Sequence, residues 1–172
     1  MTTFRFATDK DFPNLWNIIL QAKQQLKQQG SDQWQKGYPL PETLHHDISM
    51  HRGCVLCLAG KIIAYAAVIF TGEPAYEHTN GTWLSNQNYV VLHRLAVANE
   101  YKHQGMAKEM ILQVERLAIA EKVYAFRVDT HAQNEFMLRL IKSLSFVYCG
   151  KIEYEQGERL AFEKLLSPHH TP

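Results

Sequence analysis

The 172-residue chain carries 18 lysines and arginines against 17 aspartates and glutamates, and 46% of its residues are hydrophobic. A chain of this length buries roughly 70% of the surface that its unfolded form exposes, which predicts one domain over residues 1–172 with a loose tail from about residue 167. Dispersed, balanced charge excludes a nucleic-acid surface, and the longest apolar run, Ile62 to Phe70, is too short to span a membrane. We therefore expect a soluble, cytoplasmic protein.

The first half of the chain alternates strand and helix patterns. A short strand, a helix and a second, shorter helix come first, over residues 3–7, from residue 8 or 11 to Gly30, and over 42–50. Two strands follow at 53–59 and 61–70, joined as a tight hairpin at Gly60-Lys61. Residues 71–87 form a long polar connection, a length that is typical of a functional loop and equally of a surface hairpin.

Cysteines and histidines raise the question of a metal site. Cys54 and Cys57 form a CxxC pair in an apolar, strand-like stretch, where a period of two sends positions three apart to opposite faces. The chain has three cysteines, too few for a four-cysteine site, and its clustered histidines, His45, His46 and His51, lack the HExxH pattern. We therefore expect core packing for the cysteines and no bound metal.

The second half contains the most regular patterns. Asn88 to Val97 is β-branched and apolar on both faces, which is typical of a central strand covered on both sides. An amphipathic helix follows Gly105, with Met106, Met110 and Val114 on its core face. A strand, a helix and two closing strands are predicted for the remainder, at residues 124–129, 130–144, 146–150 and 159–164.

A basic, polar turn separates the strand ending at Val97 from the helix after Gly105. The first amides of any helix lack partners within it, and the helix dipole attracts anions to them. Gly105 leaves room for a ligand, and Lys102 and His103 add cationic or donor groups. The GxGxxG and GK[ST] loops are absent. The turn therefore predicts either a phosphate site of another type or an ordinary strand-to-helix turn.

Two stretches of sequence, VVLHRLAVANEYKHQGMAKEMI and RVDTHAQNEFMLRLIKSLSF, resemble the two central motifs of the GNAT superfamily of acetyltransferases, and the likeness runs from Thr3 to about Lys164. It implies an α/β fold with a mixed, mostly antiparallel central sheet of about six to seven strands flanked by about four helices. The early DQWQKGYP resembles a segment of one bacterial branch. Trp34 and Tyr38 are therefore expected either at the acceptor pocket or packed under the first helix.

The resemblance implies acetyl-CoA as the cofactor. The pantetheine arm would pair, like an added strand, with the backbone of Leu95, Ala96 and Val97. Asn134 matches the family's asparagine beside that arm. The pyrophosphate would lie on the turn and the start of the helix, at Lys102, His103, Gln104, Gly105, Met106, Ala107 and Lys108.

The implied reaction is direct transfer of an acetyl group, in a ternary complex, to a primary amine of a small molecule or peptide. His93 is the candidate base because it lies two residues before Leu95, on the same strand face, and because histidine is the side chain most often used for general acid–base catalysis. A hydrogen-bonded core histidine is the alternative. Glu73, Glu77 or a chain of water molecules could then serve as the base. No nucleic-acid or membrane partner is expected, and a homodimer stays open.

Three positions depart from the family's pattern. Ile141 stands where many relatives have a tyrosine that protonates the leaving thiolate, and Tyr148 and Tyr154 are candidate substitutes. Lys102 replaces the usual arginine or glutamine, which keeps the charge but loses the planar donor geometry, and Ser145 replaces a glycine. Ile141 favours the alternative function, a GNAT-like module that binds CoA without catalysis.

Overall fold

The computed structural model describes residues 1–168, so part of the predicted tail, 167–172, lies outside the described residues. The described chain has four α-helices, α1 (Phe12–Gln28), α2 (Pro41–Ser49), α3 (Met106–Ala120) and α4 (Glu135–Ser143). Its eight strands are β1 (Thr2–Phe6), β2 (Gly53–Leu58), β3 (Lys61–Ile69), β4 (Asn80–Gly81), β5 (Val90–Val97), β6 (Ala125–Thr130), β7 (Val147–Tyr154) and β8 (Gly157–Leu165). None of the four helices has the length and apolar character needed to cross a membrane.

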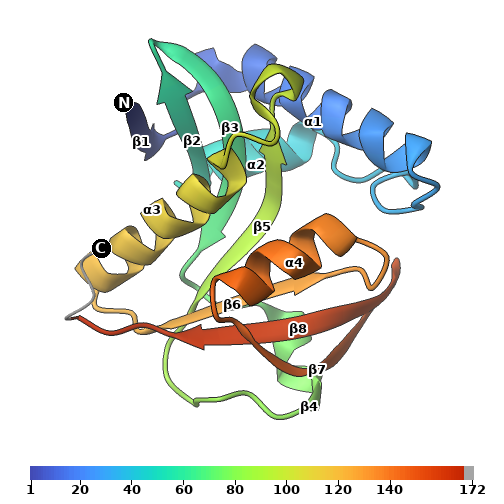
Figure 1. Cartoon of the computed structure of the whole chain (residues 1–172), viewed down its shortest axis with the longest axis vertical. Coiled ribbons are helices and arrows are strands. Elements are labelled where there is room, and N and C mark those ends of the chain that lie inside the picture. Colours follow the sequence, from blue (N-terminus) through green and yellow to red (C-terminus); the bar gives the residue numbers. More distant parts are fainter. Residues whose placement is uncertain (169–172) are drawn as a thin grey trace. The chain divides into compact units, whose positions relative to one another are not determined.

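The strands are hydrogen-bonded in the order β1-β2-β3-β5-β6-β8-β7-β4 (Figure 1). β5 and β6 run parallel, whereas β1–β2, β2–β3, β6–β8, β7–β8 and β4–β7 are antiparallel. The predicted α/β class with a mixed, mostly antiparallel sheet is confirmed. The strand number is eight rather than six to seven, because Asn80–Gly81 pairs with β7 and two residues are too few to show a sequence period.

Two predicted boundaries shift in the structure. The helix expected over 130–144 begins only at Glu135, because β6 continues to Thr130 and the Asn134 side chain caps α4 by accepting from the Met137 amide at 3.2 Å. The β2–β3 turn lies at Ala59-Gly60 rather than Gly60-Lys61, since both residues have positive φ, 49° and 79°.

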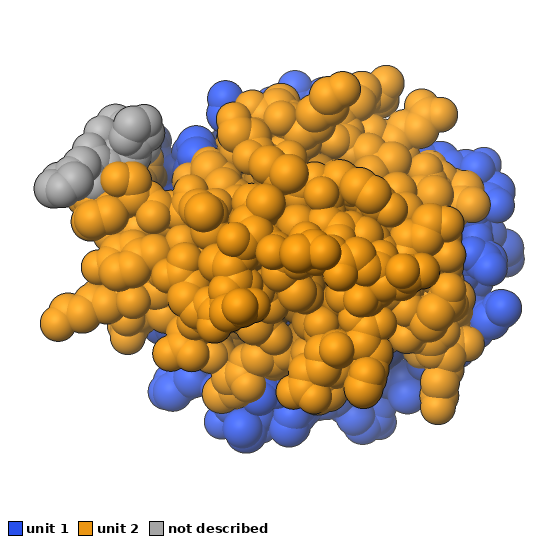
Figure 2. Space-filling view, turned by 90° about the horizontal axis from the view of Figure 1, so that it is seen from below, with its two compact units in different colours: residues 1–68, 94–113 blue, residues 69–93, 114–172 orange. Residues whose placement is uncertain are grey.

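The described chain divides into two compact units, of which the first comprises residues 1–68 and 94–113 (Figure 2). In this unit α1 and α2 lie against β2 and β3 (Figure 1). The apolar stripe of α1 places Leu15, Ile18 and Ile19 in the core, at most 3% exposed, because residues three and four apart share a helix face. They pack with side chains that include Val55 and Tyr65.

The second unit comprises residues 69–93 and 114 onward (Figure 2). A buried ion pair holds the long 71–87 connection of this unit. Arg127 Nε donates to Glu163 Oε1 at 3.1 Å, and Arg127 Nη2 donates to the Ser85 carbonyl at 2.7 Å. The amides of Leu84 and Ser85 donate to Glu163 Oε2, and the Trp83 ring stacks on the Arg127 guanidinium. The connection is therefore fixed at its C-terminal end.

Asp11, at the start of α1, predicts a pH-dependent stability. Hydrogen bonds from Arg5, with further bonds from Thr8, lower the pKa of Asp11 from 3.8 to about 2, although burial opposes them. A folded-state pKa below the unfolded one stabilises the fold above about pH 4, and this contribution is lost as the pH falls through about 2.

We therefore expect the wild type to lose about 1–2 kcal/mol more unfolding free energy between about pH 5 and pH 2 than Asp11→Asn does. Urea denaturation at both pH values measures this difference. Equal losses in the two proteins would show that Asp11 contributes nothing to acid sensitivity.

Candidate active site

The strand-to-helix turn between β5 and α3 has the backbone geometry of an anion site. The Ala98 amide donates to the Ile63 carbonyl at 2.9 Å and so fixes the end of β5. The Glu109 amide donates to the Gly105 carbonyl at 2.9 Å, which is the first α-helical bond of α3. The amides of residues 106–108 therefore precede the first donor of the helix and have no acceptor within it.

Gly105 lies at the mouth of this helix with φ of 81°, a conformation that favours glycine. A Cβ added there would meet no heavy atom within 4 Å, and residues 103–105 are exposed. The backbone conformation thus favours the glycine, and the space outside it is open to a ligand. His103 is also left-handed, with φ of 60°.

The side chains of the turn differ in what they offer an anion. The ammonium of Lys102 donates to Asn99 Oδ1 at 2.5 Å and to Gln25 Oε1, and burial lowers the pKa of Lys102. Gln104 Nε2 donates to the Glu100 carbonyl. Both side chains therefore have partners within the chain, whereas His103 and Lys108 are exposed. The backbone amides, rather than Lys102, carry the predicted anion site.

On β5, Ala96 faces the core of the first unit and is 5% exposed, while Leu95 and Val97 are half-buried. Arg94 immediately before them has φ of 56°, far from strand geometry. The regular alternation of faces that grouped His93 with Leu95 is interrupted at this residue.

His93 lies in a polar cluster within the second unit. β5 and β6 are paired at Val91↔Arg127, and His93 and Asp129 follow two residues further along each strand. Nε2 of His93 lies 2.9 Å from Glu73 Oε2, and Nδ1 lies 3.9 Å from Asp129 Oδ2. The other oxygen of Glu73 accepts from the Ala75 amide and caps the 3-10 helix Pro74–His78. The histidine is thus bracketed by two carboxylates.

Two tyrosines complete this His93 cluster. The hydroxyls of Tyr76 and Tyr154 donate to Asp129 Oδ2 at 2.7 and 3.1 Å. Burial, reinforced by the nearby Asp129 charge, raises the pKa of both tyrosines. They remain protonated donors at neutral pH, so Asp129 is held in place from two sides. The sequence did not predict that any of these residues lies beside His93. Glu73 was predicted only as an alternative base.

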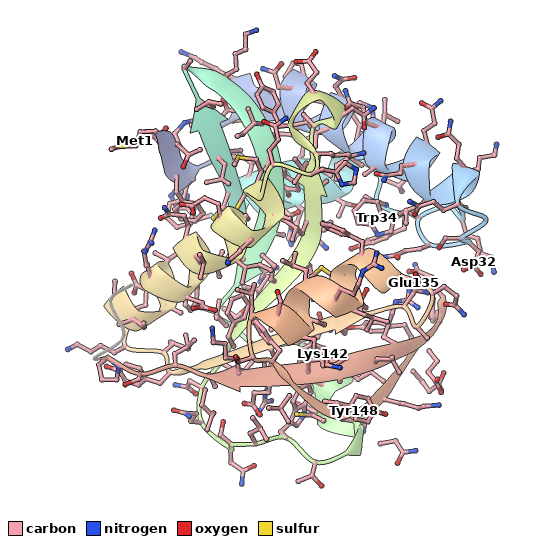
Figure 3. All side chains as sticks on the ribbon, viewed as in Figure 1. Met1, Asp32, Trp34, Glu135, Lys142 and Tyr148 are labelled. Carbon is pink, nitrogen blue, oxygen red and sulfur yellow. The ribbon has the colours of Figure 1, made fainter. Side chains whose placement is uncertain are left out.

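Of the other candidates for proton transfer, most lie apart from His93. Glu77 is exposed on the same 3-10 helix, and Tyr148, on β7 (Figure 3), is 52% exposed with its ring against Phe162. The hydroxyl proton of Tyr154 is engaged by Asp129. Ile141 is fully buried, and because its side chain is aliphatic this position of α4 carries no proton donor.

Ser145, which replaces a glycine of the family pattern, follows α4 with φ of 67°. Its amide donates to the Lys142 carbonyl and the Phe146 amide donates to the Ile141 carbonyl, so the turn that ends the helix forms despite the side chain. The departure costs about 1 kcal/mol of local strain and leaves the turn intact.

The two aromatics of the DQWQKGYP segment have different surroundings. Trp34, labelled in Figure 3, packs against the core cluster that contains Leu15 and Ile19, which is the packing arrangement expected under α1. The Tyr38 hydroxyl accepts a hydrogen bond from Arg94 Nη1 at 2.6 Å. Tyr38 is thus tied to β5.

The three cysteines are free and buried. Cys57 shares the core of the first unit with Val55, as strand alternation predicts, and Cys54 is fully buried. Burial raises the pKa of Cys54 to about 12, which suppresses the thiolate that nucleophilic or metal-binding chemistry requires.

The described chain thus combines a mixed sheet that contains one parallel strand pair with a strand-to-helix turn whose first helix amides have no acceptor within the helix. Comparison with known proteins gives the family: a model described as "Acetyltransferase (GNAT) family" matches residues 15–146. The chain therefore belongs to the GNAT acetyltransferase family. It is an acetyl-CoA-dependent N-acetyltransferase, an enzyme that moves an acetyl group from acetyl-CoA to an amine.

Solved structures agree with this assignment. A GNAT-family acetyltransferase from Streptococcus agalactiae is 33% identical over 96% of each chain, with a TM-score of 0.88. One from Listeria monocytogenes is 21% identical over 96% of this chain and 95% of its own, with a TM-score of 0.76. The PaiA N-acetyltransferase of Thermoplasma acidophilum, in complex with coenzyme A, is 15% identical over 96% and 99%, with a TM-score of 0.70. No curated protein matches.

Proposed function

We propose that the acceptor is a primary amine of a small molecule or peptide, that the acetyl group passes to it directly in a ternary complex, and that His93 with Glu73 takes up the amine proton. The observation that carries this proposal is the 2.9 Å contact between His93 Nε2 and Glu73 Oε2 on the strand leading to Leu95. A histidine oriented by a carboxylate is the arrangement used for general base catalysis.

The chemistry explains why a base matters. An alkyl amine with a pKa near 10.4 is unprotonated in about one molecule in 2,500 at pH 7, which adds about 4.6 kcal/mol to the barrier. In the tautomer that donates from Nε2 to Glu73, Nδ1 keeps a lone pair that can accept the proton. The amine nitrogen then bonds to the thioester carbon, and as the carbon–sulfur bond breaks the nitrogen releases its second proton to solvent. The leaving thiolate takes a proton from solvent, since the aliphatic side chain of Ile141 has none to give.

The cofactor contacts form the second part of the proposal. The pantetheine arm pairs with the backbone of Leu95, Ala96 and Val97. Asn134, whose Oδ1 caps α4, remains the candidate pantetheine contact that the family resemblance implies. The diphosphate lies on the turn, at the amides of His103, Gln104, Gly105, Met106 and Ala107, with Lys108 beside them and Lys102 supporting the turn. The open space at Gly105 supports this placement, and the Thermoplasma acidophilum protein of similar fold is in complex with coenzyme A.

Acidic and aromatic side chains are the candidate contacts for the acceptor. Glu73 and Asp129 suit a protonated amine. Trp34 and Tyr38 are retained as candidate acceptor contacts, with the packing of Trp34 against the core of the first unit favouring the alternative role for that residue. The net charge of +1 favours neither a nucleic acid nor an anionic membrane as partner. Three free cysteines support a reducing, cytoplasmic compartment.

A homodimer remains the open alternative to a monomer, and light scattering decides between the two.

Thiol release from acetyl-CoA in the presence of a panel of primary amines tests the proposal. We expect His93→Gln to lower kcat/KM by about 10²–10⁴-fold, with CoA affinity retained. His78→Gln, an exposed histidine of the nearby 3-10 helix, is the matched control.

Equal rates for the His93 and His78 variants would refute the role of His93. If the wild type binds acetyl-CoA but releases no thiol with any amine, the module without catalysis would replace the proposed reaction.

A further inference from the structure

Arg94 has a backbone conformation that arginine rarely adopts. It lies inside β5, between His93 and Leu95, with φ of 56°. A left-handed residue other than glycine costs roughly 1–2 kcal/mol, and such a residue persists only where the surrounding structure holds it. β-Bulges and strained residues of this kind gather at active sites, where they redirect the backbone that follows.

The side chain of Arg94 is held by a buried network within the first unit. Its Nε and Nη2 donate to the two carboxylate oxygens of Asp47, on α2, at 2.9 and 2.6 Å. Nη1 donates to the Tyr38 hydroxyl at 2.6 Å, and the Tyr65 hydroxyl, on β3, donates to Asp47 Oδ2 at 2.5 Å. The side chains of Arg94 and Asp47 are only 9% and 2% exposed.

A buried ion-pair network of this kind adds little to the free energy of unfolding compared with apolar packing. Removing two charges from water costs several kcal/mol per ion, and well-packed apolar residues often stabilise a core as well or better. The fork of an arginine on a carboxylate, in contrast, fixes direction as well as distance. Asp47 of α2 and Tyr38 therefore bond directly to the one residue of β5 with left-handed backbone, and Tyr65 of β3 supports it through Asp47.

We infer that Asp47 and Arg94 are positioning residues: their ion pair holds the left-handed bend in β5 and thereby orients the backbone of Leu95–Val97 toward the thioester arm of acetyl-CoA. The inference rests on the proposed placement of the cofactor. It assigns neither residue a direct part in bond making, and Tyr38 supports the pair as the third partner of the guanidinium.

Isothermal titration with two probes tests the inference. Acetyl-CoA carries both the diphosphate and the arm, whereas 3′-phosphoadenosine 5′-diphosphate carries the nucleotide and diphosphate without the arm. For Asp47→Asn we expect the Kd of acetyl-CoA to rise about 10-fold, the equivalent of one charge-assisted hydrogen bond, and the Kd of the shorter probe to stay unchanged. Arg94→Lys keeps the charge but loses the fork, so we expect an intermediate rise for acetyl-CoA only.

Asp11→Asn is the matched control, because Asp11 also pairs with an arginine in the first unit but is bonded to Arg5 and Thr8. Its affinity for both probes should equal that of the wild type. Equal weakening of both probes by Asp47→Asn and Arg94→Lys, or no change in either, would overturn the inference. If Asp47→Asn does not fold, Arg94→Lys decides by the same criterion. A wild type that binds neither probe would instead refute the proposed cofactor site.

Discussion

We expect Gly105→Asp to weaken coenzyme A binding by about 100-fold and Gly105→Asn to weaken it by less than about tenfold. Asparagine and aspartate have the same shape, and both tolerate the left-handed region in which Gly105 lies at φ of 81°. Only aspartate adds a negative charge to the mouth of α3, where it would repel the two charges of a diphosphate bound as proposed. At about 5 Å and an intermediate dielectric, that repulsion amounts to about 2–3 kcal/mol.

Gly30→Asp supplies the control for this Gly105 comparison. Gly30 has φ of 74°, open space at its Cβ and a place after α1, away from the turn that leads into α3. Titration of CoA into the four proteins, the wild type included, measures the effect. The same affinity for the Gly105→Asp and Gly30→Asp variants would mean that the diphosphate does not bind at this turn.

Glu163→Ala should lower the free energy of unfolding by about 3–5 kcal/mol, since it leaves a buried guanidinium without its partner. Glu163 is fully buried and accepts from Arg127 Nε and from the amides of Leu84 and Ser85, and Arg127 is 5% exposed. The loss therefore combines an uncompensated charge with two amides that lose their acceptor.

Glu158→Ala is the appropriate comparison for Glu163→Ala. It removes an ion pair with Lys151 whose side chains are 47% and 42% exposed, and exposed pairs contribute less than about 1 kcal/mol. Urea denaturation at neutral pH measures both variants. Similar losses for the two would show that the Arg127–Glu163 pair is no more important than a surface contact.

Much of the site was outside the reach of sequence reasoning because its contacts join distant segments. Glu73 and His93 are 20 residues apart, and Tyr76 and Asp129 are 53 apart. No periodicity or spacing relates them, since their proximity depends on how β5, β6 and the 71–87 connection fold together. Arg94 is missed for a different reason: arginine has no preference for left-handed turns, so its bend leaves no local signal.

The sequence by itself determined the alternation of helices and strands, the mixed α/β class and the strand-to-helix turn at Gly105, because amphipathic period and glycine conformation are local properties. The tertiary structure decided which carboxylate reaches His93, that Lys102 is tied to Gln25 and Asn99, and that Trp34 packs, partly buried, against the core. These outcomes depend on long-range packing, where the cost of burying a charge or a ring is settled by partners that only the folded chain brings together.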